Sequence, residues 1–271
     1  MRFLVTGAAG FIGFHLSLRL LSDGHTVVGI DNLNSYYDIK LKKARLNILK
    51  KNSNKKNFIF FKQDLKNSKK LKKIFRRYNF NFVIHLAAQA GIRFSIKQPR
   101  QYIDSNIIGF YNILECVKDI KSKLIFASSS SVYGKTNKRI FNENHKTSKP
   151  LQLYAATKKS NEVMGHAYYN LYNLTIIGLR FFTVYGPFGR PDMSIYKFTE
   201  NIVKGKKIDL YNYGNHLRDF TNIIDVIDCV INCVKKYKDN KKPKFEIFNV
   251  GNSKPIKINY LVQLISKALQ K

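Results

Sequence analysis

The chain has 271 residues, of which 44% are hydrophobic. This is enough apolar material for a full core, and it excludes a disordered or fibrous protein. Its net charge of +31 is typical of nucleic-acid-binding proteins, but the lysines are spread through segments such as 40–56, 62–73 and 235–244. We therefore expect a solvated basic surface that attracts polyanionic small molecules, and we do not expect nucleic acid as a partner.

The cysteines and the N-terminus indicate the compartment. Cys116, Cys229 and Cys233 have no metal-ligand spacing, so we predict buried thiols in a reducing environment and no metal site. The chain starts with a strand-like run, Arg2 to Thr6, rather than a leader, and it has no apolar stretch of the roughly 20 residues that a membrane span needs. A cytoplasmic protein without a membrane span is expected.

Short apolar runs alternate with amphipathic segments of helix length. Strands are expected at 3–6, 27–30, 58–61, 82–86, 124–127 and 175–181. The alternation predicts the α/β class with a Rossmann-type, doubly wound parallel sheet.

Beyond Gly186 the pattern becomes irregular, with a helix expected near 194–204 and short strands near 208–220. These features predict a smaller C-terminal substrate-binding lobe. The apolar helix pattern at 223–234 is expected to return to the first domain. The predicted division is a first domain of 1–183 joined by 223–250, and a lobe of 184–222 and 251–271.

The first predicted strand runs into TGAAGFIG at 6–13, and a helix is expected from 15 to 21. Glycines at these spacings allow a tight turn and let a helix N-terminus face a pyrophosphate, although glycines alone also make ordinary turns. Asp31 ends the next strand, where it can accept hydrogen bonds from ribose hydroxyls and repel a 2′-phosphate, so NAD is favoured over NADP. Asp64 follows the third strand and either binds adenine or caps a helix before Lys66.

A possible base lies in YAATK, where Tyr154 and Lys158 are four residues apart at the start of a helix-length segment. This spacing places the phenol and the ammonium group on one helix face, where the cation would lower the tyrosine pKa from about 10. A surface pair is the default explanation for such spacing. Serines 128–131 follow a predicted strand at the carboxyl edge, where they make either a capped turn or a hydroxyl cluster that binds a sugar.

The order of TGAAGFIG, HLAAQAG, SSSSVYG and YAATK resembles the extended short-chain dehydrogenases of the NAD-dependent epimerase/dehydratase group, over nearly the whole chain. Within that group the sequence is similar to the UDP-glucuronate 4-epimerases. This finer likeness lies in DNLNSYYD at 31–38, HLAAQAGIRFS at 85–95 and LRFFTVYGPFGRPDM at 179–193.

The resemblance implies roles for individual residues. Tyr154 is the base, Lys158 holds the nicotinamide ribose and tunes Tyr154, and Ser129 orders the substrate 4-hydroxyl. Asn106 matches a position that shapes the active-site helix, although an asparagine within a helix is more often structural. The predicted cofactor-binding residues are Gly7, Gly10, Phe11, Ile12, Gly13, Asp31, Asn32, Asp64, Leu65, Ala87, Ala88, Asn106, Tyr154 and Lys158.

The implied reaction is an epimerisation without net oxidation. The base takes the 4-hydroxyl proton while the C4 hydride moves to NAD, and the 4-keto sugar then turns and receives the hydride on its other face. Related dehydratases and decarboxylases carry acidic residues at or beside Ser130 and Ser131, whereas this chain has hydroxyls there. Together with Ser129 and Thr183, these hydroxyls are expected to hold a C5 carboxylate, which favours a UDP-hexuronate substrate.

Three arginines are candidates for the remaining substrate contacts. Arg190 and Arg218 lie in segments that face the nucleotide diphosphate in the family, and Arg93 is a weaker candidate. A guanidinium group can bind phosphate with two hydrogen bonds, while a surface ion pair is the alternative for Arg190 and Arg218.

Several alternatives stay open. Family members usually extend beyond residues 261–271, so the lobe is expected to be short or truncated, and a homodimer through the helices at 98–117 and 153–172 is expected. A UDP-glucose or UDP-N-acetylglucosamine 4-epimerase is the runner-up. A non-catalytic nucleotide-binding or RNA-binding member of the fold is a further alternative, against which the Tyr154, Lys158 and Ser129 set argues.

Overall fold

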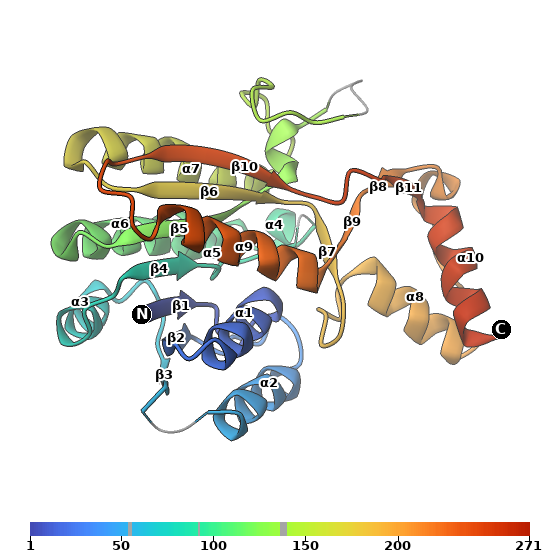
Figure 1. The fold of residues 1–271 in the computed structure, drawn as a ribbon. Helices are drawn as coiled ribbons and strands as arrows, with labels where there is room; N and C mark the ends of the chain where they lie inside the picture. Colours follow the sequence, from blue (N-terminus) through green and yellow to red (C-terminus); the bar gives the residue numbers. More distant parts are fainter. Residues whose placement is uncertain (54–55, 92, 136–139) are drawn as a thin grey trace.

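The computed structural model describes residues 1–53, 56–91, 93–135 and 140–271 (Figure 1). The strands are β1 (Arg2–Thr6), β2 (Thr26–Asp31), β3 (Phe58–Lys62), β4 (Phe82–His85), β5 (Lys123–Ser129), β6 (Ile176–Phe181), β7 (Thr183–Tyr185), β8 (Leu217–Arg218), β9 (Phe220–Asn222), β10 (Phe245–Val250) and β11 (Ile256–Lys257). The α-helices are α1 (Phe11–Ser22), α2 (Ile39–Lys51), α3 (Ser68–Arg77), α4 (Phe94–Lys97), α5 (Pro99–Tyr102), α6 (Gly109–Ile120), α7 (Leu153–Tyr172), α8 (Ser194–Val203), α9 (Ile223–Tyr237) and α10 (Ile258–Leu269). A π-helix, η1 (Ile103–Ile108), and two 3-10 helices, η2 (Ser130–Tyr133) and η3 (Tyr211–Gly214), complete the elements.

The central sheet has seven parallel strands in the order β10-β6-β5-β4-β1-β2-β3. The chain therefore runs outward in both directions from β1 and β4, which is the doubly wound arrangement. Parallel strands must be covered on both faces, and this explains their nearly continuous apolar sequences. The predicted α/β class with a Rossmann-type sheet is confirmed.

Two apolar cores lie on opposite faces of the sheet. The first joins α1, α2 and α9 to the sheet, with Phe14, Leu46 and Val226 buried in it. The second lies under α3 and α6 and includes Leu71 and Phe110. Figure 1 shows α1 and α2 on the near face, with α9 crossing the same face, while α6 and α7 lie behind the sheet.

The chain leaves the central sheet after β6 and returns to it through α9 and β10. In Figure 1, α8 and α10 lie side by side well beyond the end of the sheet, together with the short pair β8 and β11. We refer to the segments from α8 to β8 and from β11 to α10 as the C-terminal lobe. β10 pairs with β6 at the edge of the central sheet, and α9 packs into the first core.

The structure differs from the expected elements at two places. The short strands expected near 208–220 are partly replaced by η3, within which Asn212 and Tyr213 have positive φ angles of 48° and 50°. The segment before α6 contains η1, a π-helical stretch that the apolar periodicity did not predict. Such stretches are rare and are often found next to functional sites.

Within the described part of the chain, no helix is long and apolar enough to cross a membrane.

Candidate active site

A cavity of about 1230 Å³ opens at the carboxyl edge of the sheet, and its lining includes the segments that follow β1, β4, β5 and β6. It extends from the glycine turn after β1 to Leu217–Asp219 beside the C-terminal lobe. The predicted site residues that line it are Gly7, Gly10, Phe11, Ile12, Gly13, Asp31, Asn32, Asp64, Leu65, Ala87, Ala88, Arg93, Ser129, Ser130, Ser131, Tyr154, Lys158, Thr183, Arg190 and Arg218. Open α/β sheets hold ligands at this edge, where the strand order reverses.

The turn between β1 and α1 requires glycine. A Cβ atom at Gly7, whose φ is +71°, would lie 2.9 Å from the backbone nitrogen of Ala87. A Cβ atom at Gly13 would lie 2.1 Å from the carbonyl oxygen of Gly7. The chain can therefore turn sharply here and direct the N-terminus of α1, with its unpaired N–H groups, toward the cavity, as a diphosphate requires.

Asp31 is 8% exposed and ends β2 at the rim of the cavity. It accepts backbone hydrogen bonds from Ala9 at 3.2 Å and Leu33 at 2.8 Å. Burial raises the pKa of Asp31, and the positive charge of Lys42 is the largest opposing effect. Each carboxylate oxygen retains further acceptor capacity, which suits a pair of ribose hydroxyls.

Each carboxylate oxygen of Asp64 accepts a hydrogen bond within the protein. Its Oδ1 atom accepts from the backbone nitrogen of Lys66 at 2.9 Å, and its Oδ2 atom accepts from Asn32 Nδ2 at 3.1 Å. Asp64 therefore closes a turn at Lys66, whereas the N-cap of α3 is Asn67, so the helix-cap alternative is not what the structure has. Asp64 and Asn32 both line the cavity.

Tyr154, Lys158 and Ser129 meet where α7 packs against the end of β5. Lys158 is 2% exposed, and its Nζ atom donates to the carbonyl oxygen of Ala127 in β5 at 2.8 Å. The hydroxyl of Ser129 is close enough to the phenol of Tyr154 to lower its pKa. Ser131 donates to Ser129 Oγ at 2.9 Å. The three residues predicted from the sequence to act together are thus adjacent in the structure.

The electrostatics of Tyr154 differ from the expectation. Burial raises the pKa of Tyr154, and the effects that oppose this are the hydrogen bond from Ser129 and the charge of Arg190. Lys158, which was expected to lower this pKa, is not among these effects. Burial lowers the pKa of Lys158 itself to about 8, and its amine donates to the carbonyl of Ala127. That Lys158 tunes Tyr154 stays a prediction.

Hydroxyl groups line the cavity next to Ser129. Ser130 and Ser131 lie on η2 directly after β5, and Thr183 begins β7. Ser128 differs from its neighbours, because its hydroxyl donates to Glu162 Oε1 at 2.7 Å. The hydroxyl cluster that lines the cavity is therefore formed by residues 129–131 with Thr183, and none of these side chains is a carboxylate.

The three predicted arginines all reach the cavity but have different partners. Arg190 donates from Nε to Asp192 Oδ1 at 3.0 Å, and this ion pair lines the cavity rather than lying on the open surface. Arg218 is exposed and donates to the carbonyl of the preceding residue at 2.8 Å. Arg93 donates to the hydroxyl of Tyr211 at 2.7 Å, and its guanidinium carbon lies 3.9 Å from the centre of that ring.

Asn106 is the predicted cofactor residue that does not line the cavity. It is 1% exposed within η1, where its Oδ1 atom accepts from the backbone nitrogen of Gln89 at 2.8 Å. Its Nδ2 atom donates to Thr157 Oγ1 at 3.0 Å. The side chain joins the segment after β4 to α7, while Ser105 faces the cavity instead. The structural alternative for Asn106 is therefore correct in this structure.

Sequence reasoning missed the polar contacts that join the glycine turn to the loop at 186–192. Arg45 is fully buried, and it donates to the carbonyls of Ala9 at 2.9 Å and Phe188 at 2.6 Å. Tyr36 donates to Asp192 at 3.0 Å. The sequence feature that could have indicated these contacts is a pair of basic residues, Lys42 and Arg45, three positions apart on a helix that follows Asp31.

These residues fit NAD. The glycine turn and α1 provide a diphosphate site, Asp31 can accept from ribose hydroxyls, and Lys158 lies beside Tyr154 at the opposite end. Among the described residues, no group of three or more His, Cys, Asp or Glu side chains is arranged to hold a metal ion.

Comparison with known proteins places the chain in a family. The model of the NAD dependent epimerase/dehydratase family matches residues 3–251. UDP-glucuronate 4-epimerase 4 of Arabidopsis thaliana is 42% identical over 98% of this chain, which spans 63% of the plant protein.

Two solved structures of sugar-nucleotide epimerases support the same family assignment. UDP-glucuronic acid 4-epimerase from Bacillus cereus, solved with UDP-glucuronic acid and NAD, superposes with a TM-score of 0.91 at 34% identity, over 100% of this chain and 84% of that one. UDP-glucose 4-epimerase from Thermotoga maritima gives a TM-score of 0.84 at 28% identity, over 98% and 82%. The chain therefore belongs to the NAD-dependent epimerase/dehydratase family, in which it is an NAD-dependent sugar-nucleotide epimerase.

Proposed function

We propose that this protein interconverts UDP-glucuronate and UDP-galacturonate. The observation that carries the proposal is the hydroxyl cluster of Ser130, Ser131 and Thr183 beside the Ser129–Tyr154 pair. Neutral hydroxyls can hydrogen-bond a C5 carboxylate without repelling it, and they supply neither the acid nor the base that elimination needs. The higher identity to glucuronate epimerases than to the glucose epimerase supports the same substrate.

The residues at the end of β5 suit proton transfer at C4. The Tyr154 phenolate takes the 4-hydroxyl proton and later returns it, and the Ser129 hydroxyl orients both oxygens. When bound in the cavity, NAD would supply the acceptor and donor for the C4 hydride. Lys158 is placed to hold the nicotinamide ribose, and Ser130, Ser131 and Thr183 hold the carboxylate so that the 4-keto sugar does not lose CO₂.

The remaining contacts are assigned to the diphosphate and the cofactor. Arg190 and Arg218 bind the substrate diphosphate, with Arg93 at the rim.

The two-domain division, with 1–183 and 223–250 as the NAD-binding domain, is supported by the path of the chain through the sheet. The homodimer stays a prediction.

The direct test is incubation of purified protein with UDP-glucuronate, followed by chromatographic separation of the two uronate forms. UDP-glucose and UDP-N-acetylglucosamine are assayed in parallel. Formation of UDP-galacturonate at a kcat/KM well above that for either neutral sugar supports the proposal. Faster turnover of a neutral sugar refutes the uronate assignment and favours the runner-up, whereas turnover of none of the three refutes both.

Variants test the carboxylate pocket. Thr183→Ala and Ser130→Ala should lower epimerisation of UDP-glucuronate or release CO₂. Ser160→Ala is the matched control, since its hydroxyl donates to the carbonyl of Ala156 within α7. Unchanged kinetics without CO₂ in both pocket variants would contradict the assigned pocket.

A further inference from the structure

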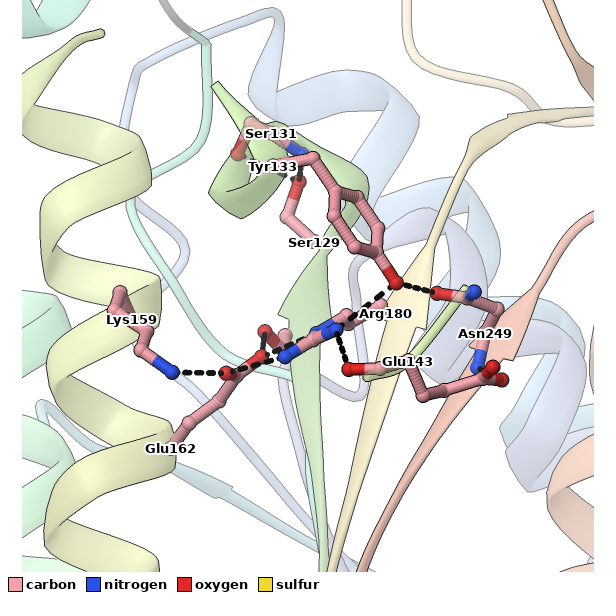
Figure 2. Close-up of polar contacts among 9 residues, drawn as sticks. Ser129, Ser131, Tyr133, Glu143, Lys159, Glu162, Arg180 and Asn249 are labelled. Carbon is pink, nitrogen blue, oxygen red and sulfur yellow. Dashed lines mark hydrogen bonds and ion pairs between the residues drawn. The ribbon is translucent and has the colours of Figure 1, made fainter. Parts of the chain in front are cut away.

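A buried ion pair lies directly behind the site. Arg180 of β6 and Glu162 of α7 are each 3% exposed, and they form a bidentate pair with Nε–Oε1 at 2.8 Å and Nη2–Oε2 at 2.9 Å. Figure 2 shows the guanidinium group between this carboxylate and the ring of Tyr133. The fork geometry fixes the direction of both side chains, which a lysine ammonium cannot do.

The pair continues to both sides as one connected network. On one side, Ser128 of β5 donates to Glu162 at 2.7 Å. On the other side, Arg180 Nη1 donates to the hydroxyl of Tyr133 at 2.9 Å, and that hydroxyl donates to Asn249 Oδ1 at 2.6 Å. We call the residues Ser128, Tyr133, Glu162, Arg180 and Asn249 the Glu162–Arg180 network.

A further branch reaches the segment that walls the cavity. Arg180 Nη1 donates to the carbonyl of Glu143 at 3.1 Å, and the backbone nitrogen of Asn249 donates to the Glu143 side chain at 2.7 Å. Asn249 also donates to the carbonyl of Phe141 at 3.2 Å, and both residues line the cavity. The network thus holds this wall against the ends of β6 and β10 (Figure 2).

The placement relative to the reacting groups is specific. Ser128 precedes Ser129, Glu162 lies one helical turn after Lys158, and Tyr133 closes the turn that carries Ser130 and Ser131. The distance between the Tyr154 phenol and the Ser129 hydroxyl depends on how α7 lies against β5. Ser128 and Arg180 lie opposite each other on the paired strands β5 and β6. Because both are bonded to Glu162 of α7, the network holds α7 against β5 and so sets that distance.

We infer that Arg180 and Glu162 are positioning residues for epimerisation, which clamp α7 to β5 and β6 so that Tyr154, Ser129 and Lys158 keep their mutual geometry. This inference rests on the assignment of those three residues as the catalytic set under the proposed function. It does not depend on which UDP-sugar is the substrate. A misplacement of about 1 Å in such a set lowers the rate by about 100-fold.

The test compares Arg180→Lys, Glu162→Gln and Tyr133→Phe with the wild type, on whichever UDP-sugar the wild type turns over fastest. Rates are expressed per NAD-loaded site, so that loss of folded protein is not counted as loss of catalysis. Lys159→Gln is the matched control, because Lys159 contacts the same carboxylate at 3.2 Å from a side chain that is 32% exposed.

We expect kcat to fall by about 10-fold to 100-fold in Arg180→Lys and Glu162→Gln, with KM for the UDP-sugar within about twofold of the wild type. The acid limb of the kcat profile should move to higher pH, because a misaligned Ser129 stabilises the Tyr154 phenolate less well. Lys159→Gln should keep the wild-type kcat. Tyr133→Phe removes one hydroxyl and should lower kcat several-fold. If the other two variants do not fold, the kcat of Tyr133→Phe decides whether the network positions the catalytic residues.

A purely structural role gives a different result. In that case the melting temperature falls, while kcat per NAD-loaded site and the pH profile stay at wild-type values in every variant that folds. That outcome would overturn the inference. If the wild type turns over no UDP-sugar, the proposed function fails and the positioning role fails with it. If the wild type is active and the variants keep its kcat and pH profile, the positioning role alone is refuted.

Discussion

Replacement of Lys158 by Met should make the protein more stable near pH 7 while it removes activity. Burial lowers the pKa of this lysine from 10.5 to about 8, so the folded state disfavours the charged amine. The difference of about 2.5 pKa units corresponds to about 3 kcal/mol of destabilisation when the amine is charged in both states. A methionine of similar length avoids this cost.

The net gain is smaller because a hydrogen bond is lost. Without the amine, the carbonyl of Ala127 loses its donor at 2.8 Å, which costs about 1–2 kcal/mol. We therefore expect Lys158→Met to raise the unfolding free energy by about 1–2 kcal/mol at pH 7. A lowered lysine pKa destabilises the fold fully below pH 8, and this effect fades as the pH rises toward 10.5. By pH 9.5 the advantage should have fallen by about 2 kcal/mol and vanished.

The measurement is urea denaturation of the NAD-free wild type and variant at pH 7 and pH 9.5. Lys159→Met serves as the control, because its side chain is 32% exposed and should show little change between the two pH values. A stability difference between Lys158→Met and wild type that is independent of pH would refute the reasoning, since it would mean that the amine is not desolvated in the fold.

Three further predictions concern the same cavity. Tyr154→Phe should lower kcat by about 100-fold to 10,000-fold with NAD still bound, because the base is lost but the cofactor contacts remain; normal turnover would exclude Tyr154 as the base. Gly13→Ala should prevent NAD binding in a fluorescence titration, since its Cβ would lie 2.1 Å from the Gly7 carbonyl; wild-type affinity would show that the turn can relax. Glu162→Ala should lower the unfolding free energy by about 3–5 kcal/mol in urea, because it leaves the Arg180 charge buried without its partner; a loss below about 1 kcal/mol would show that water replaces the carboxylate.

Local patterns predicted the features that depend on neighbouring residues. The glycine turn directly follows the first predicted strand, and Asp31 ends the second. Both could be identified because neighbouring residues alone define these positions. The six predicted strands appear at their expected places for the same reason, with boundaries that differ by up to two residues. Lys158 and Tyr154 lie on one face of α7, as the helical spacing required.

Features that depend on tertiary contacts could not be predicted. Arg180 is the one charged residue of the apolar strand β6, but its partner Glu162 is on a different element, and the sequence does not show that the two side chains meet. The pKa of Tyr154 depends on desolvation and on Arg190, a residue 36 positions away that only the fold brings near. The resemblance implies a cofactor role for Asn106, whereas its side chain is bonded to Gln89 and Thr157, because it lies within a π-helix in which ordinary helical spacing does not give the direction of a side chain.

The segments in which the chain passes between the sheet and the C-terminal lobe are hydrogen-bonded to one another. β7 and β9 run as a parallel pair from Thr183 to Tyr185, and Asp219, just before β9, accepts from the backbone nitrogens of Asn252 and Ser253 at 3.0 and 2.7 Å. This ribbon is the neck through which the chain enters and leaves the C-terminal lobe. Thr183 lies on the ribbon itself, so the residue that the proposed function assigns to the substrate carboxylate is also part of the connection to the lobe.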